Sequence, residues 1–106
     1  MNILGCPVKV GINSSIYFPV NYLHVYGIDM YYDLLIRQQF ESCFIFRPFE
    51  KRLLKQNETI EKVRGGNVFL PKHWLTENKL KPGDSYMYLI GIDDGLLISA
   101  EPRIKL

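Results

Sequence analysis

The side chains of this chain that most often take part in catalysis or metal binding are few and widely spaced. Cys6 and Cys43 form no Cys-x-x-Cys pair, so they predict neither a zinc site nor a redox pair. His24 and His73 have no serine or cysteine neighbour at the spacing of a known catalytic motif. We therefore expect these four residues to have structural roles and to bind no metal.

Longer catalytic signatures are absent from the sequence as well. It contains no P-loop, no Gly-x-Gly-x-x-Gly, no His-Glu-x-x-His and no Gly-x-Ser-x-Gly. The acidic pair Asp93-Asp94 precedes Gly95, an arrangement that is ordinary in a hairpin turn. We expect that the protein is not an enzyme and needs no cofactor.

The composition excludes several other classes of protein. The chain has 106 residues, 47% of them hydrophobic, which favours a packed core over a disordered chain. It has 13 basic and 11 acidic residues, so its net charge of +2 rules out a histone-like basic coat but allows a local basic patch. It has no apolar run of about 20 residues and no signal-peptide pattern, so we expect a soluble, cytoplasmic protein.

The elements that would position any site repeat along the chain. A shift of 52 residues lays residues 8–48 on residues 60–100 without a gap, and it matches Pro19 with Pro71 and Leu23 with Leu75. Each half reads as a strand, a polar loop, a strand that ends at proline, a short helix and a hairpin. We predict a single domain, 1–106, with repeat one at 8–48, a linker at 49–59 and repeat two at 60–102.

The expected elements follow from apolar runs and turn residues. Loops 13–15 and 65–67 contain Ser, Asn and Gly, which tolerate the positive φ of a tight turn. We expect Trp74, Tyr22 and Leu75 to pack in the core. The predicted strands are 8–12, 16–18, 34–40, 43–47, 60–64, 68–70, 85–92 and 96–100, and the predicted helices are 20–26 and 72–78.

The second half has the pattern of a known family. The run 63–71 (VRGGNVFLP) is followed by an apolar helical turn, by 80–84 (LKPGD), by two strands and by the turn 93–95 (DDG). This order resembles the AbrB/MazE/SpoVT family. The first half resembles a degenerate copy, because it keeps Pro19 and the hairpin but has Tyr31-Tyr32 in place of Gly83-Asp84.

The resemblance implies an all-β fold with short helices. The fold that the resemblance implies is a small closed β-barrel of the cradle-loop type, a type that includes swapped-hairpin, RIFT and double-psi barrels. In this family two short chains interleave their hairpins. Two tandem ββαββ repeats in one chain imply a monomeric pseudo-dimer or a homodimer, and closure of the barrel would remove exposed sheet edges.

The resemblance also implies a DNA-binding transcription regulator that binds double-stranded DNA. Family members use basic and amide residues around the first loop and second strand, which here are Arg64, Asn67 and Lys72, with His73 beside them. The matching positions of the first half carry no charge. The nearest polar substitutes there are Lys9, Asn13 and Ser14.

Two alternatives remain open on the sequence. A protein-interaction module of the antitoxin or inhibitor kind is consistent with the low net charge and with Met30, Tyr31 and Tyr32, which occupy an expected polar turn and would form an interface if exposed. A small-ligand barrel is the third possibility, since loops of Asn, Ser and Gly could surround a ligand.

Overall fold

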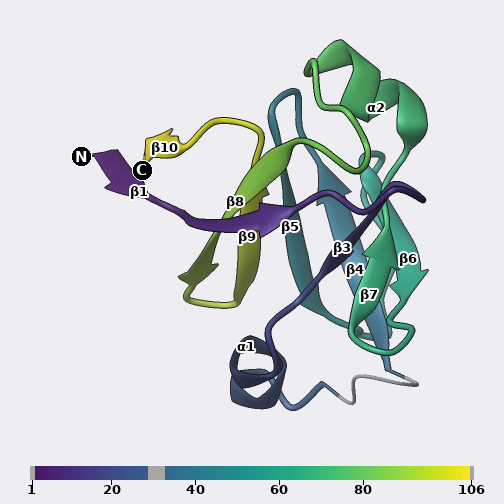
Figure 1. Cartoon of the computed structure of the whole chain (residues 1–106). Coiled ribbons are helices and arrows are strands. Elements are labelled where there is room, and N and C mark those ends of the chain that lie inside the picture. The colour runs from purple at the N-terminus through teal and green to yellow at the C-terminus, as the bar shows by residue number, and fades with distance from the viewer. Residues whose placement is uncertain (1, 29–32, 106) are drawn as a thin grey trace.

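The chain folds mainly into antiparallel β-strands with two six-residue helices (Figure 1). The computed structural model describes residues 2–28 and 33–105. Within them the order β-β-α-β-β occurs twice. The first set is β2 (Cys6–Lys9), β3 (Ser15–Tyr17), α1 (Val20–Val25), β4 (Leu34–Gln39) and β5 (Cys43–Pro48). The second set is β6 (Glu58–Lys62), β7 (Asn67–Phe69), α2 (Lys72–Glu77), β8 (Tyr86–Ile92) and β9 (Gly95–Ser99). Strands β1 (Asn2–Leu4) and β10 (Arg103–Lys105) lie at the two ends of the described chain.

Corresponding elements of the two sets are separated by a constant spacing. Helices α1 and α2 begin at Val20 and Lys72, and strands β3 and β7 begin at Ser15 and Asn67, so both pairs are 52 residues apart. The predicted short helices and the two hairpins are confirmed at these positions.

The first strand of each set differs from the prediction. Strands were expected at 8–12 and 60–64, but β2 and β6 begin two residues earlier and end at Lys9 and Lys62. The chain is already turning beyond these ends, because Gly11 N donates to the Ser15 carbonyl at 2.7 Å and Arg64 N donates to the Asn67 carbonyl at 2.9 Å.

The strand order interleaves the two halves. The six-stranded sheet has the order β2-β8-β9-β5-β4-β6, and all its pairs are antiparallel. The first strand of each half pairs with the hairpin of the other half, and the two hairpins meet through β5 and β9. Strands β3 and β7 form a separate ribbon. The six-stranded sheet is open, with β2 and β6 as its edge strands, so the closed barrel stays a prediction.

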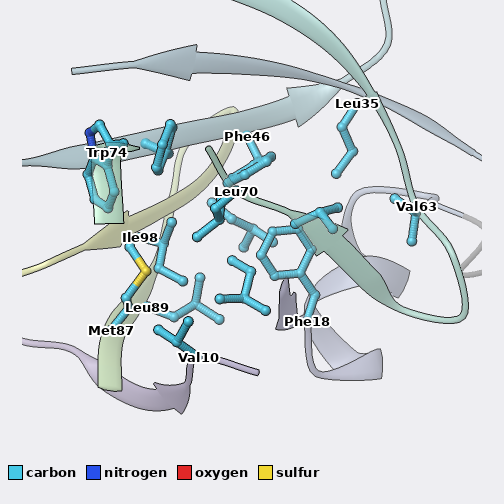
Figure 2. Packing of buried hydrophobic residues seen from close by; sticks show 14 of the residues in the cluster. Val10, Phe18, Leu35, Phe46, Val63, Leu70, Trp74, Met87, Leu89 and Ile98 are labelled. Carbon is cyan, nitrogen blue, oxygen red and sulfur yellow. The ribbon is translucent and has the colours of Figure 1, made fainter. Parts of the chain in front are cut away.

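The core fills the space enclosed by the sheet, the β3–β7 ribbon and the helices (Figure 2). Phe18 packs edge-on against Phe46, with ring centroids 5.0 Å apart. Trp74 lies 4.3 Å from the ring of Phe44, and its indole N–H donates to the Phe40 carbonyl at 2.9 Å. Burial of these aromatic rings contributes much of the hydrophobic stabilisation of the fold.

Both helices are too short to be stable alone, so their stability comes from packing. Each follows a proline, Pro19 or Pro71, whose fixed φ suits the start of a helix. The predicted core positions Trp74 and Leu75 are buried on α2, and Tyr22 is partly buried against the core. Neither helix in the described part of the chain is long and apolar enough to cross a membrane.

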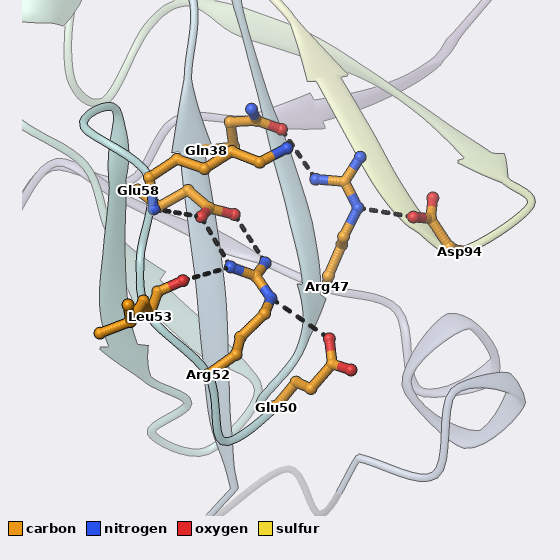
Figure 3. Close-up of polar contacts among 8 residues, drawn as sticks. Gln38, Arg47, Glu50, Arg52, Leu53, Glu58 and Asp94 are labelled. Atoms are coloured by element: carbon orange, nitrogen blue, oxygen red, sulfur yellow. Dashed lines mark hydrogen bonds and ion pairs between the residues drawn. The ribbon is translucent and has the colours of Figure 1, made fainter.

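The linker between the two halves is fixed by an ion-pair network (Figure 3). Arg52 donates two hydrogen bonds to the Glu58 carboxylate, at 2.9 and 2.8 Å, and Lys55 N donates a third at 2.7 Å. The Glu58 side chain is 1% exposed. These hydrogen bonds, from Arg52 first and then from Lys55 N, lower the pKa of Glu58 to about 2. The carboxylate therefore fixes the linker where β6 begins, inside the segment that the sequence predicted to be linker.

We expect the stability of the protein to fall in acid because of Glu58. Its pKa is lower in the folded chain than its ordinary value of 4.5, so its contribution is fully present above pH 4.5 and is lost as the pH falls towards 2. Urea unfolding of wild type and Glu58→Gln between pH 2.5 and 7 measures this. Glu58→Gln is expected to have a lower free energy of unfolding at pH 7 than wild type. Its free energy of unfolding should also change less between pH 2.5 and 7. The matched control is Glu77→Gln, because Glu77 is exposed and forms no ion pair within the described residues. If the free energy of unfolding of Glu58→Gln changes with pH in parallel with that of wild type, Glu58 is not the cause of the acid sensitivity.

Candidate nucleic-acid interface

The β3–β7 ribbon presents one face to the core and one to solvent. Ile16 and Val68 lie opposite each other in the register and are fully buried. Because side chains alternate across a strand, the flanking pairs lie on the other face, where Tyr17 and Phe69 are exposed, Asn67 is half-buried and Ser15 is buried. These pairs are Ser15 opposite Phe69 and Tyr17 opposite Asn67.

The geometry of the turn before β7 explains why two glycines and an asparagine occupy it. Gly65 and Gly66 have φ of 58° and 83°, and Arg64 and Asn67 exchange both backbone hydrogen bonds across them, at 2.9 and 3.0 Å. Two central residues with positive φ define the hairpin turn in which glycine is favoured. The Asn67 side-chain amide donates to the Gly65 carbonyl at 3.3 Å, so in this structure it stabilises the turn.

The loop before β3 is built differently. Ser14 has a φ of 64°, and Ser14 N donates to the Gly11 carbonyl at 3.0 Å. The Ser15 hydroxyl donates to the Asn13 side-chain oxygen at 2.7 Å, and Asn13 itself is exposed. The polar side chains of this loop therefore stabilise the turn and leave only the Asn13 amide at the surface.

The antiparallel pairing places each loop beside the end of the other strand. Leu70 N donates to the Ser14 carbonyl, and Phe18 N donates to the Gly66 carbonyl, each at 2.8 Å. The residues that the sequence predicts to bind DNA consequently divide into two groups. Asn13, Ser14, Lys72 and His73 lie at one end of the ribbon, where α2 begins, and Arg64 and Asn67 lie at the other, where α1 follows β3.

The exposed cations at the two ends form no ion pair with an acidic side chain of the described residues. Within residues 2–28 and 33–105, the ion pairs involve Arg37, Arg47 and Arg52. Arg64 and Lys72 are exposed and belong to none of these pairs. Both cations are therefore available to an anionic partner.

Two of the predicted DNA-binding residues, Ser14 and Lys9, do not belong to the exposed surface of the ribbon. Ser14 is 3% exposed, so we remove it from the set that could contact a surface ligand. Lys9 lies opposite Tyr86 on an edge strand and points away from the core, on the outer face of the sheet rather than on the ribbon. The interface candidates Met30, Tyr31 and Tyr32 lie outside the described residues.

The sequence reasoning missed Tyr17 and Phe69. Each is 44% exposed on the outer face of the ribbon. The runs at 16–18 and 68–70 were predicted as apolar strands, without a statement of which side chains face solvent. The two-residue period of a strand places Tyr17 and Phe69 on the face opposite Ile16 and Val68, but the three apolar residues of each run do not show which face is outside.

The comparisons with known proteins give one structural likeness. No protein-family model matches the chain, and no curated protein matches it significantly. Among solved structures, it is similar to the solution structure of PHS018 from Pyrococcus horikoshii, with a TM-score of 0.44 and 18% identity over 100% of this chain and 98% of that one. A likeness at this level says nothing of function.

The metal-ligating and nucleophilic side chains of the described residues are dispersed. Among them, no group of three or more His, Cys, Asp or Glu side chains lies close enough to bind a metal ion. The two free cysteines, Cys6 and Cys43, are exposed and half-buried respectively, and burial raises the pKa of the Cys43 thiol. A raised pKa makes the thiol a poorer nucleophile at neutral pH.

Proposed function

We propose that the protein is a DNA-binding transcription regulator of the AbrB/MazE-like type that places the β3–β7 ribbon in the major groove of double-stranded DNA. The supporting observation is the two-stranded ribbon with the exposed rings of Tyr17 and Phe69 on its outer face and, at each end, an exposed cation that forms no ion pair within the described residues. The major groove admits a two-stranded β-ribbon. In this arrangement Asn67 and Tyr17 face the base edges.

The separation of the cations suits the width of the groove. Arg64 lies opposite Asn67 across the Gly65-Gly66 turn, and the five residues from Asn67 to Lys72 span at most about 17 Å at about 3.3 Å per residue. The major groove is about 12 Å wide, so cations at opposite ends of the ribbon would reach phosphates on its two sides. Arg64 would bind phosphate or guanine through its planar fork, whereas Lys72 would act as a point charge.

The same proposal includes a fused architecture. The two ββαββ repeats have a constant spacing, and the first strand of each repeat pairs with the hairpin of the other repeat. Both observations support an internal pseudo-dimer. We propose that this cytoplasmic chain is a cradle-loop barrel and works as a monomer, since it supplies both strands of the ribbon itself.

A protein-interaction module is the second candidate. The exposed rings of Tyr17 and Phe69 favour it, because clustered aromatic side chains are enriched at protein interfaces. Capture of partners from the native cell extract, with and without nuclease, separates the two candidates. Partners that survive nuclease and are lost in Tyr17→Ser favour the module, and partners lost on nuclease treatment favour DNA binding.

We expect Arg64→Ala and Lys72→Ala each to weaken binding to a DNA duplex by about five- to tenfold, because each removes a phosphate contact. The double variant should lose about 25- to 100-fold if the contacts are independent. Fluorescence anisotropy with a labelled duplex at low salt measures this.

The matched controls for these substitutions are Arg103→Ala and Lys51→Ala. Each removes the same charge from an exposed position away from the ribbon, on β10 and in the linker. They should change the affinity less than twofold. Equal losses in the controls and in the ribbon variants would show that only net charge matters and would overturn the proposed interface.

A further inference from the structure

A second site is suggested by Arg37, an arginine inside the fold. It lies on β4, opposite Phe46 on one side and Thr59 on the other, and so on the same face of the sheet as the core aromatic residues. Its side chain is only 11% exposed, and its guanidinium carbon lies 5.3 Å from the centre of the Phe44 ring. A cation in such a place requires partners for its donors.

The donors of Arg37 are only partly satisfied. Nη1 lies 3.0 Å from Glu61 Oε1 and donates a weak bond to the Phe69 carbonyl at 3.5 Å. Nε is buried and has no partner within the described part of the chain. Nη2 makes no hydrogen bond within the described residues either. The edge formed by Nε and Nη2 therefore has no partner there, and it is one of the edges with which a guanidinium binds two oxygens at once.

A polar pocket adjoins this side chain. It has a volume of about 200 Å³ and is lined by Arg37, Gln39, Gln56, Asn57 and Thr59. Two backbone and side-chain hydrogen bonds join Gln39 to Asn57, at 2.9 and 3.1 Å, and fix the wall between β4 and the linker turn. No carboxylate is among the lining residues. The Thr59 hydroxyl already donates to Glu61 Oε1 at 3.3 Å, so the further donors are the side-chain amides of Gln39 and Gln56.

The charge of Arg37 is destabilised where it lies. Burial lowers the pKa of its guanidinium, and the Glu61 carboxylate opposes that shift. A second anion on the free edge would add to the effect of Glu61 and would satisfy the orphan donor.

We propose that this pocket binds the oxyanion of a small ligand, a carboxylate or a phosphate, side-on to the Nε–Nη2 edge of Arg37. The site is separate from the exposed cations of the ribbon, so it does not depend on DNA binding. Its size suits a single anionic group rather than a whole nucleotide.

The test is a titration of the whole protein followed through the Nε–Hε signal of Arg37 in ¹⁵N-correlated NMR spectra. Inorganic phosphate and acetate are added in separate arms at constant ionic strength, and they identify which oxyanion binds. A saturable shift of this signal in either arm supports the site. Absence of a saturable shift in both arms overturns it.

Variants of Arg37 show whether its planar guanidinium, rather than its charge alone, binds the oxyanion. Arg37→Lys keeps a positive charge beside Glu61 but loses the fork, and we expect at least about tenfold weaker binding, followed on the backbone amides of Gln39 and Asn57. Arg103→Lys is the matched control and should bind like wild type. If Arg37→Lys does not fold, Gln56→Ala replaces an exposed lining residue and should weaken binding severalfold. Unchanged binding in the variant that folds would contradict the proposal.

Discussion

Trp74→Ala is expected to lower the free energy of unfolding by about 3–5 kcal/mol, the range for loss of a large buried aromatic ring. Trp74 is 1% exposed, packs on Phe44 at 4.3 Å and bonds to the Phe40 carbonyl. Removal of the ring also leaves that carbonyl without its donor. Urea unfolding followed by circular dichroism measures the change, since Trp74 is the single tryptophan of the chain and fluorescence is lost with it.

The control for this substitution is Trp74→Phe. Phenylalanine keeps an aromatic ring against Phe44 but cannot donate to the Phe40 carbonyl, so a smaller loss of about 1–3 kcal/mol is expected. A loss below about 1 kcal/mol in Trp74→Ala would contradict the central place of this ring in the core, because even small core truncations reach that value.

Gly95→Ala is expected to destabilise the fold by about 3 kcal/mol or more, at the upper end of the cost of overpacking. A Cβ at Gly95 would collide with the carbonyl oxygen of Phe46, a backbone atom of the neighbouring strand. The β5–β9 pairing is the link between the two hairpins of the sheet, so a shift there disturbs both halves. Thermal unfolding by circular dichroism measures the effect.

The neighbouring strand β8 offers a matched control for this glycine. A Cβ at Gly91 would meet only side-chain atoms of Tyr22 and Tyr26, at 3.7 and 3.8 Å, which is ordinary contact. Gly91→Ala should change the free energy of unfolding by less than about 0.5 kcal/mol. Similar losses of free energy of unfolding in Gly95→Ala and Gly91→Ala would mean that the close approach of the Phe46 carbonyl to Gly95 does not cause the destabilisation.

The order of elements could be predicted from the sequence because it depends on local signals. Pro19 and Pro71 mark the strand ends, and the turn residues mark both hairpins. The β1–β10 ribbon could not be predicted, since its three-residue strands pair across nearly the whole chain. The start of β6 at Glu58 was also missed, because burial of a charged residue is not expected from the sequence; the Glu58 carboxylate is buried where it accepts hydrogen bonds from Arg52 and from Lys55 N.

The residue types of the candidate site could be predicted from the sequence, but their positions in space could not. Arg64 and Lys72 are exposed, as a binding role requires. Arg64 precedes β7 and Lys72 follows it, so local order puts them at opposite ends of the ribbon. The antiparallel pairing of β3 with β7, which brings Asn13 to the end where Lys72 lies, joins residues about 50 positions apart, and no local pattern reveals it. Arg37 gave no signal in the sequence, because its burial depends on which face of β4 meets the core.

The salt dependence of binding to a duplex of mixed sequence tests the proposed function most directly. Wild-type protein is titrated by mobility shift or fluorescence anisotropy between about 25 and 200 mM salt. Two phosphate contacts, from Arg64 and Lys72, predict a slope of log affinity against log salt of about −2, and the double alanine variant should flatten it. Absence of binding at the lowest salt would contradict the account.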